Sequence, residues 1–210
     1  VTIKVATGPR YKIGNIKVDC SDNPQVLSML GPVILADITH VKPGNFVNLE
    51  KVLKGAQRLQ KYLQTMGYPF AEIGEPQGKV NDDKQTLDII YTINPHTLAR
   101  IDGTYIHGLS HIEDSYIRNR LLWKEGEIFD QEKVDKSRRK LLETGLLSSV
   151  NIVTEKKGDL KDGYQPVNMI VKTSEGAARA VGVGAQFSTS EGIGGHLFWH
   201  HNNVARYGQH

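Results

Sequence analysis

The sequence is poor in the residue types that disulfides, metal clusters and membrane helices require. Among its 210 residues there is one cysteine, Cys20, which excludes an internal disulfide and any cysteine-based metal cluster. Aromatic residues make up 7% of the chain. No apolar run approaches the roughly 18 residues of a membrane-spanning helix, and no signal peptide opens the chain. It begins within a strand-like alternation, VTIKVATG, so we expect a piece of a longer mature protein.

Excess charge of either sign is also missing. The chain has 26 Lys and Arg against 23 Asp and Glu, a net charge of +3, and its basic residues are scattered among acidic ones. Nucleic acid is therefore not indicated as a partner, because nucleic-acid-binding faces gather their basic residues. The hydrophobic fraction of 39% and the mean hydropathy of −0.38 are typical of a water-soluble chain.

The sequence does contain one short motif twice, which we call the repeated phrase. Residues 42–52 read KPGNFVNLEKV and residues 124–134 read KEGEIFDQEKV, and the two copies align without a gap. Apolar residues recur after each copy at three- and four-residue steps, which predicts two amphipathic helices. Asn48 and Asp130 are the expected N-caps. The following residues are predicted to be buried: Leu53 and Ala56 in the first helix, Val134 and Leu141 in the second.

The predicted strands and helices on either side of the two copies also follow the same order. Alternating apolar runs predict strands at residues 10–18, 68–76 and 86–94, and again at 98–106, 146–155 and 167–175. A shorter helix is expected between the first strand and the long helix of each set. Asn23-Pro24 opens the first of these helices, and Ser110 with Glu113 has the capping-box spacing for the second.

This order predicts an α+β fold of two tandem β-α-α-β-β units. In each unit we expect a three-stranded mixed sheet with two helices on one face, and the second strand lies at an edge. Pro69 and Pro76 bracket that strand in the first unit, and proline is tolerated at edges because its missing N–H need not pair. The predicted domains are 10–94 and 95–175, with residues 1–9 ending a preceding unit.

Residues 176–210 have a different composition, with few charges and many glycines. Val181, Val183, Ala185 and Phe187 alternate with small or polar residues, a pattern that suits the wall of a membrane barrel. We expect a linker here, followed by the first strands of an outer-membrane β-barrel.

These units resemble polypeptide-transport-associated (POTRA) domains. The motifs GPRYKIGNI, GYPFAEI, RRKLLETGLLSSVNI and GVGAQFSTSEGIGG are similar, in this order, to TamA-like outer-membrane subunits of translocation and assembly modules. That group belongs to the surface-antigen superfamily, which also contains BamA. Leu147 stands where phenylalanine is common in the family, and the resemblance implies that only about two strands of the family's many-stranded barrel are present.

The resemblance implies a function in protein transport at the outer membrane, with this piece mostly in the periplasm. Expected partners are unfolded outer-membrane or secreted clients, an inner-membrane-anchored periplasmic subunit and, through the missing barrel, the outer membrane. The alternative is a scaffold that only docks partners, in a BamA-like assembly factor or a two-partner secretion pore. No enzymatic activity and no cofactor are expected.

An exposed strand edge binds extended segments through main-chain hydrogen bonds, without demanding a particular sequence. The predicted edges are residues 70–75 and 149–155. The candidate partner-binding residues are Phe70, Ala71, Glu72, Ile73, Ser149, Asn151 and Val153, and we expect proline at Ala71 or Ile73 to weaken binding while it leaves the fold intact.

Other chemistry is poorly supported. The glycine-rich runs after residue 180 do not open a helix, as a dinucleotide loop must. His196 and His200 share one face of a strand while His201 points away, so we expect no zinc site. Asp82-Asp83 lies in a solvated turn, and Arg138-Arg139-Lys140 covers an exposed helix face.

Overall fold

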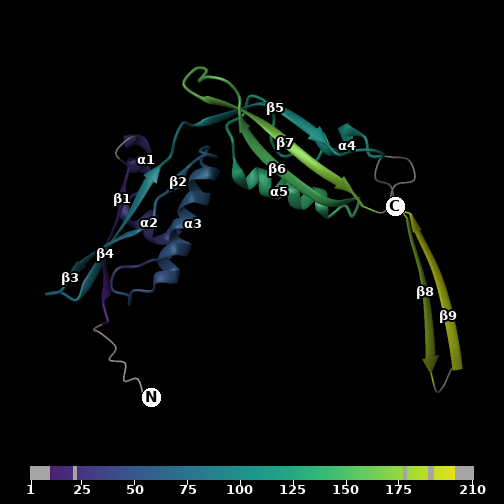
Figure 1. The fold of residues 1–210 in the computed structure, drawn as a ribbon, viewed down its shortest axis with the longest axis horizontal. Helices are drawn as coiled ribbons and strands as arrows, with labels where there is room; N and C mark the ends of the chain where they lie inside the picture. The colour runs from purple at the N-terminus through teal and green to yellow at the C-terminus, as the bar shows by residue number, and fades with distance from the viewer. Residues whose placement is uncertain (1–9, 21–22, 177–178, 189–191, 202–210) are drawn as a thin grey trace, which may run out of the picture. The chain divides into compact units, whose positions relative to one another are not determined.

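The computed structural model describes residues 10–20, 23–176, 179–188 and 192–201 (Figure 1). The chain divides into two compact units, residues 1–99 and 100–210, which we call unit 1 and unit 2. The predicted end of a preceding domain, residues 1–9, lies outside the described residues.

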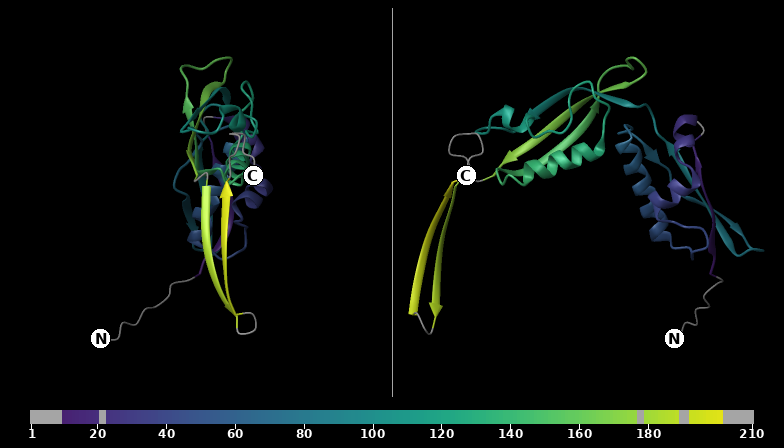
Figure 2. Two further views of the ribbon diagram at one scale, coloured as in Figure 1. Left: turned by 90° about the vertical axis from the view of Figure 1, so that its right-hand side faces the viewer. Right: turned by 180° about the vertical axis from the view of Figure 1, so that it is seen from behind.

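Unit 1 consists of a mixed sheet with helices on one face (Figures 1 and 2). Its elements are β1 (Lys12–Asp19), α1 (Pro24–Met29), α2 (Pro32–Thr39), α3 (Leu49–Thr65), β2 (Glu72–Ile73), β3 (Gln77–Asn81) and β4 (Thr86–Asn94). The central strand β4 pairs in parallel with β1 on one side. On its other side β4 pairs antiparallel with β2 and, further along, with β3.

Two details of unit 1 differ from the predicted β-α-α-β-β order. One helix was expected before α3, and the structure has two, because Gly31 and Pro32 end α1 and start α2. The expected second strand is split into β2 and β3. Pro76 has no N–H to donate to β4, so the ladder is interrupted there.

Unit 2 follows the predicted order. Its elements are β5 (Ala99–His107), α4 (Asp114–Arg118), α5 (Gln131–Leu142), β6 (Leu147–Lys156) and β7 (Gln165–Glu175). The strand order is β5-β7-β6, with β6 and β7 antiparallel, and β5 and β7 run in the same direction in Figure 1. β6 packs on α5, which lies along one face of the sheet (Figure 2).

A hairpin of β8 (Arg179–Ser188) and β9 (Gly192–His201) forms a sheet of its own. The two strands pair antiparallel, with Val181 opposite Trp199. The tail of the chain thus contains two strands, as predicted. That they open a membrane barrel stays a prediction, and residues 189–191 and 202–210 lie outside the described part.

The predicted core is confirmed in unit 2 and partly wrong in unit 1. Val134 is 5% exposed and Leu141 is fully buried. In α3, however, Leu53 is 46% exposed and Ala56 is half-buried, whereas Val52 is buried. The buried stripe of α3 is Val52, Gly55, Leu59 and Leu63, and Leu53 is rotated about 100° around the helix from Val52, which places it at the solvent side.

The predicted N-caps of the long helices are confirmed. The Asn48 side chain accepts a hydrogen bond from the Lys51 N–H at 3.0 Å, and the Asp130 side chain accepts one from the Glu132 N–H at 2.8 Å. The predicted capping box at Ser110 is wrong. α4 begins after Glu113, whose side chain makes no capping bond, and the Ser110 N–H donates to Glu175 of β7 instead.

Candidate partner-binding strand edges

The repeated phrase closes the outer edge of the first strand of each unit. In unit 1 the Gly44 N–H donates to the Ile13 carbonyl at 2.7 Å, and the Ile13 N–H donates to the Asn45 carbonyl at 2.7 Å. Gly44 has φ of 86°, a backbone conformation that glycine adopts without the cost of a Cβ. The phrase thus occupies backbone groups of β1 that point away from β4.

In unit 2 the second copy makes the same two bonds. The Gly126 N–H donates to the Ile101 carbonyl at 2.7 Å, and the Ile101 N–H donates to the Glu127 carbonyl at 2.9 Å. Gly126 also has φ of 86°. Each copy of the phrase therefore covers the outer edge of a strand and then supplies the N-cap of the following helix. These two shared roles account for the repeat.

The edge of β5 is closed further along by side chains. The Thr104 N–H donates to Glu125 Oε1 at 3.2 Å, and the Thr104 carbonyl accepts from Arg118 Nη2 at 3.2 Å. The Thr104 hydroxyl accepts from Trp123 Nε1 at 3.1 Å. With its main-chain groups held in this way, β5 is a poor site for an added strand at Ile101 and Thr104.

The other edge of the unit 2 sheet is formed by β6. This strand has 10 residues, and no other described strand lies on the side away from β7. The Lys157 N–H, just beyond β6, donates to the Pro166 carbonyl at 2.9 Å. Residues of an antiparallel strand point their backbone groups alternately toward and away from the partner. By that alternation, the N–H and C=O groups of Val150, Ile152 and Thr154 point away from β7.

The predicted residues Ser149, Asn151 and Val153 do lie on β6, with Ser149 and Asn151 exposed and Val153 half-buried. Their backbone groups, however, point toward β7, opposite Ser174, Lys172 and Ile170 respectively. Main-chain docking at this edge would therefore use the residues between them. Which residues of a strand turn their backbone groups outward depends on the pairing register of that strand. The sequence pattern does not reveal this register.

The predicted edge in unit 1 is much shorter than residues 70–75. Phe70 lies in a turn, and Glu72 and Ile73 form a two-residue strand opposite Asn94 and Ile93. Because the Gly74 N–H donates to the Thr92 carbonyl at 2.9 Å, only Ile73 of β2 turns its backbone groups outward.

Ala71 does not belong to an accessible edge. It is 1% exposed, its N–H donates to the Tyr68 carbonyl at 3.1 Å, and its carbonyl accepts from Gln60 Nε2 at 2.9 Å. Proline at Ala71 would remove the first of these bonds inside the core, so we expect this substitution to destabilise the fold rather than to leave it intact.

Glu175, at the end of β7, fixes the loop that follows β5. Its Oε1 accepts backbone N–H bonds from Ser110, His111 and Ile112 at 2.7, 2.8 and 3.0 Å. Partial burial raises the pKa of this carboxyl, but the three N–H bonds and His111 outweigh burial and lower the pKa to about 2. Glu175 is thus ionised at neutral pH and ties the end of the central strand to the β5–α4 loop.

The remaining polar candidates have structural surroundings. In the described part of the chain, no group of three or more His, Cys, Asp or Glu could hold a metal ion. Cys20 is buried and its Sγ donates to the Asn23 carbonyl at 3.6 Å. Asp82 accepts from the Tyr11 hydroxyl at 2.8 Å. The side chains of His196, His200 and His201 lie outside what the structure describes. Within the described residues, no helix has the length and apolar character to cross a membrane.

Comparison with known proteins identifies the repeated unit. The POTRA family model, described as a surface antigen variable number repeat, matches residues 31–96 and 99–176. The chain belongs to this family. The two matches cover more than half of the chain; the first runs from α2 past β4 and the second from β5 to the end of β7. The resemblance to POTRA domains is therefore confirmed.

The curated relatives are named outer membrane protein assembly factor BamA. The relative from Nitratidesulfovibrio vulgaris is 26% identical over 195 residues, 93% of this chain and 24% of its own length. That from Neorickettsia risticii is 23% identical, over 97% of this chain and 26% of its own length. The chain thus spans about a quarter of these relatives.

Solved structures agree on the fold. BamA from Haemophilus ducreyi lacking POTRA domains 1–3 has a TM-score of 0.72 at 19% identity, over 94% of this chain and 36% of that chain. POTRA domains 3–5 of Haemophilus influenzae BamA have a TM-score of 0.65 at 16% identity, over 79% of this chain and 61% of that one. The α+β fold of tandem POTRA units is therefore shown, whereas the TamA-like assignment is not.

Proposed function

We propose that this chain is the periplasmic POTRA region of an outer-membrane protein that helps other outer-membrane or secreted proteins to insert or cross. In this proposal the POTRA domains are residues 10–94 and 95–175, and the tail 176–210 leads into a membrane barrel. The POTRA region binds partners and has no catalytic role or cofactor.

The observation that carries the proposal is the difference between the two edges of unit 2. The edge of β5 is held by the repeated phrase and by Glu125 and Arg118, whereas β6 has outward-pointing main-chain groups on a 10-residue strand. Open edges are aggregation hazards that proteins usually cover. In the same sheet one edge is closed and the opposite edge is open, which is consistent with the open edge serving as the binding surface for an added strand.

Two versions of the function, among those that the sequence left open, are supported by a specific observation. The order of sequence motifs supports a TamA-like subunit, and the names of the curated relatives support a BamA-like assembly factor. Because clients of both would be unfolded and rich in strands, β6 serves either version. The inner-membrane-anchored partner belongs only to the TamA-like version, so capture of such a subunit by the intact protein would favour it.

Hydrogen exchange tests the edge directly. In the free protein the N–H groups of Asn151 and Val153 should exchange slowly, and those of Ile152 and Thr154 quickly. A saturating unfolded outer-membrane client should slow exchange at Ile152 and Thr154 at least tenfold. Binding without added protection at these two residues would refute strand addition at β6. Unchanged protection at Ile73 would show that β2 is not used.

A further inference from the structure

The two repeats differ at the start of their first strands. Lys12 and Arg100 are equivalent, because each forms the isolated bridge to the repeated phrase, at Phe46 and Ile128 respectively. Lys12 Nζ lies 5.9 Å from the centre of the Phe46 ring. The guanidinium of Arg100 instead lies 3.9 Å from the centre of the Tyr164 ring. Since unit 1 folds without a stacked arginine, the POTRA fold does not require one.

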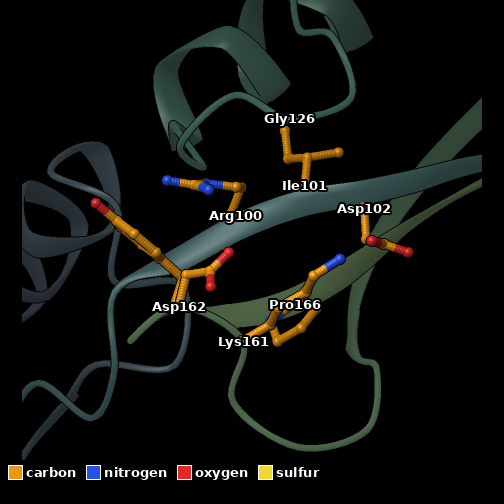
Figure 3. A pocket seen from close by; sticks show the side chains of 8 residues that line it. Arg100, Ile101, Asp102, Gly126, Lys161, Asp162 and Pro166 are labelled. Atoms are coloured by element: carbon orange, nitrogen blue, oxygen red, sulfur yellow. The ribbon is translucent and has the colours of Figure 1, made fainter.

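The stacked arginine lines a pocket of about 210 Å³ in unit 2. Figure 3 shows Arg100 on β5, Gly126 of the repeated phrase on one side, and Lys161 and Asp162 of the β6–β7 loop on the other. The Lys161 side chain extends toward Asp102 in this view. The lining residues come from β5, the repeated phrase, the β6–β7 loop and the start of β7, and none of them belongs to β6 itself.

The walls of the pocket are held by main-chain bonds. Gly126 is bonded to Ile101, as described above. Lys161 and Tyr164 exchange two backbone hydrogen bonds of 2.9 Å each, around a two-residue turn at Asp162 and Gly163. A site whose walls are fixed before a ligand arrives loses less entropy on binding.

Arg100 has hydrogen-bonding capacity that the described part of the chain does not use. Stacking on Tyr164 occupies one face of the guanidinium and leaves the donors along its edges. Its Nε is buried and has no hydrogen-bond partner among the described residues. A planar guanidinium with spare edge donors matches the geometry of a carboxylate.

The local charge favours a ligand with a single negative charge. Arg100 and Lys161 line the pocket with Asp102 and Asp162. Lys157 forms an ion pair with Asp102, and this hydrogen bond and charge lower the pKa of the Asp102 carboxyl. Two cations and two anions line the pocket, and Lys157, which lies outside the lining, balances Asp102. One positive charge is therefore left over, and a phosphate dianion would meet both aspartates.

We propose that this pocket binds one carboxylate, from an Asp or Glu side chain in an acidic segment of a partner protein. Arg100 donates hydrogen bonds from the edge of its guanidinium to the carboxylate oxygens, and Lys161 adds attraction from the loop. The site is independent of strand addition at β6, so either proposal stands if the other fails.

Nuclear magnetic resonance of the full 210-residue chain provides the test. The probe is the capped peptide Ac-Ser-Glu-Ser-Glu-Ser-NH2, compared at constant ionic strength with its Gln counterpart and with inorganic phosphate. We expect saturable shifts of the Arg100 side-chain Nε–H and of the Gly126 and Lys161 amides with the Glu peptide. The Gln peptide and phosphate should bind at least fivefold more weakly. Equal binding of the Gln peptide, or tighter binding of phosphate, would overturn the proposal.

Variants locate the site. Arg100→Lys keeps the charge but loses the planar fork, and it should weaken the Glu peptide at least fivefold, as should Arg100→Gln. Arg139→Gln, on the exposed face of α5, removes the same charge elsewhere in unit 2 and should change nothing. Lys161→Gln alters only an exposed loop residue, and it should weaken binding of the Glu peptide about twofold. If the Arg100 variants do not fold, this variant tests whether the pocket is the binding site. Unchanged affinity in Lys161→Gln and in a folded Arg100 variant would contradict the assignment.

Discussion

Gly55 of α3 lies directly against the hydroxyl of Tyr91 on β4. A Cβ on Gly55 would be 2.8 Å from Tyr91 Oη and 3.2 Å from the backbone oxygen of Thr39. The same hydroxyl donates to the Val52 carbonyl at 3.1 Å, and burial raises the pKa of Tyr91 to about 12. This contact sets how closely α3 approaches both the sheet and α2.

We therefore predict that Gly55→Ala destabilises unit 1, although alanine is the better helix former. The gain in helix propensity is about 1 kcal/mol, and overpacking of this kind costs about 1–3 kcal/mol, so we expect a net loss of roughly 1 kcal/mol. In a Tyr91→Phe background the loss should shrink, because the closest atom is gone. Urea unfolding of the four proteins measures the coupling. Additive effects of the two substitutions would contradict the described contact.

A second prediction concerns Glu175 and acid. Its pKa falls from an ordinary 4.5 to about 2 in the folded chain, so its contribution is complete above the unfolded pKa and disappears as the pH falls through the folded one. The shift corresponds to on the order of 3 kcal/mol. Glu175→Gln should therefore lower stability clearly at pH 7 and hardly at pH 2. Urea unfolding across this range checks it, with exposed Glu143→Gln as the control. A pH-independent difference would disprove the role of the charge.

Third, the two glycines of the repeated phrase should have the same cost of replacement. Gly44 and Gly126 both have φ of 86°, and a Cβ at either would meet nothing within 4 Å. The cost of alanine is then conformational only, about 1–2 kcal/mol at each position. Thermal unfolding followed by residue-resolved spectroscopy assigns each loss to its own unit. A loss at only one of the two glycines would mean that the phrase has different roles in the two units.

Fourth, proline should distinguish the two sets of residues along β6. Asn151→Pro removes an N–H that points to β7, whereas Thr154→Pro removes one that points away. We expect the first to cost about 1–3 kcal/mol more in unfolding free energy. Thr154→Val controls for the hydroxyl, which contacts Met169 Sδ at 3.6 Å. Equal costs for the two prolines would reject the described register.

The sequence predicted the repeated architecture well because the periodicity, the caps and the turn residues all lie within each local segment. Asn48 and Asp130 could be recognised as caps from their place before an apolar stripe. The capping box at Ser110 failed for the opposite reason. Its N–H is bonded to Glu175, 65 positions later, and no local pattern records such a partner.

The candidate edges likewise combine local features, which the sequence predicted, with tertiary features, which it did not. Pro69 and Pro76 correctly indicated a strand that is not central. Gly74 and Pro76 also lie where this strand is split into β2 and β3, so the split could have been predicted from these two residues. The burial of Ala71 depends on Gln60 and Tyr68, and the outward groups of Val150, Ile152 and Thr154 depend on which residues of β7 lie opposite. Both are products of tertiary pairing.

The alternation along β6 also limits how a guest strand can move. Val150, Ile152 and Thr154 offer three outward N–H and three outward C=O groups, and each bond to them gives about 0.5–1.5 kcal/mol net. A guest held by so few bonds is released readily. If it slides by one residue, its side chains change faces, so a guest with one apolar side returns to an equivalent position only after two residues. A guest of alternating apolar and polar residues would therefore move along this edge in steps of two residues.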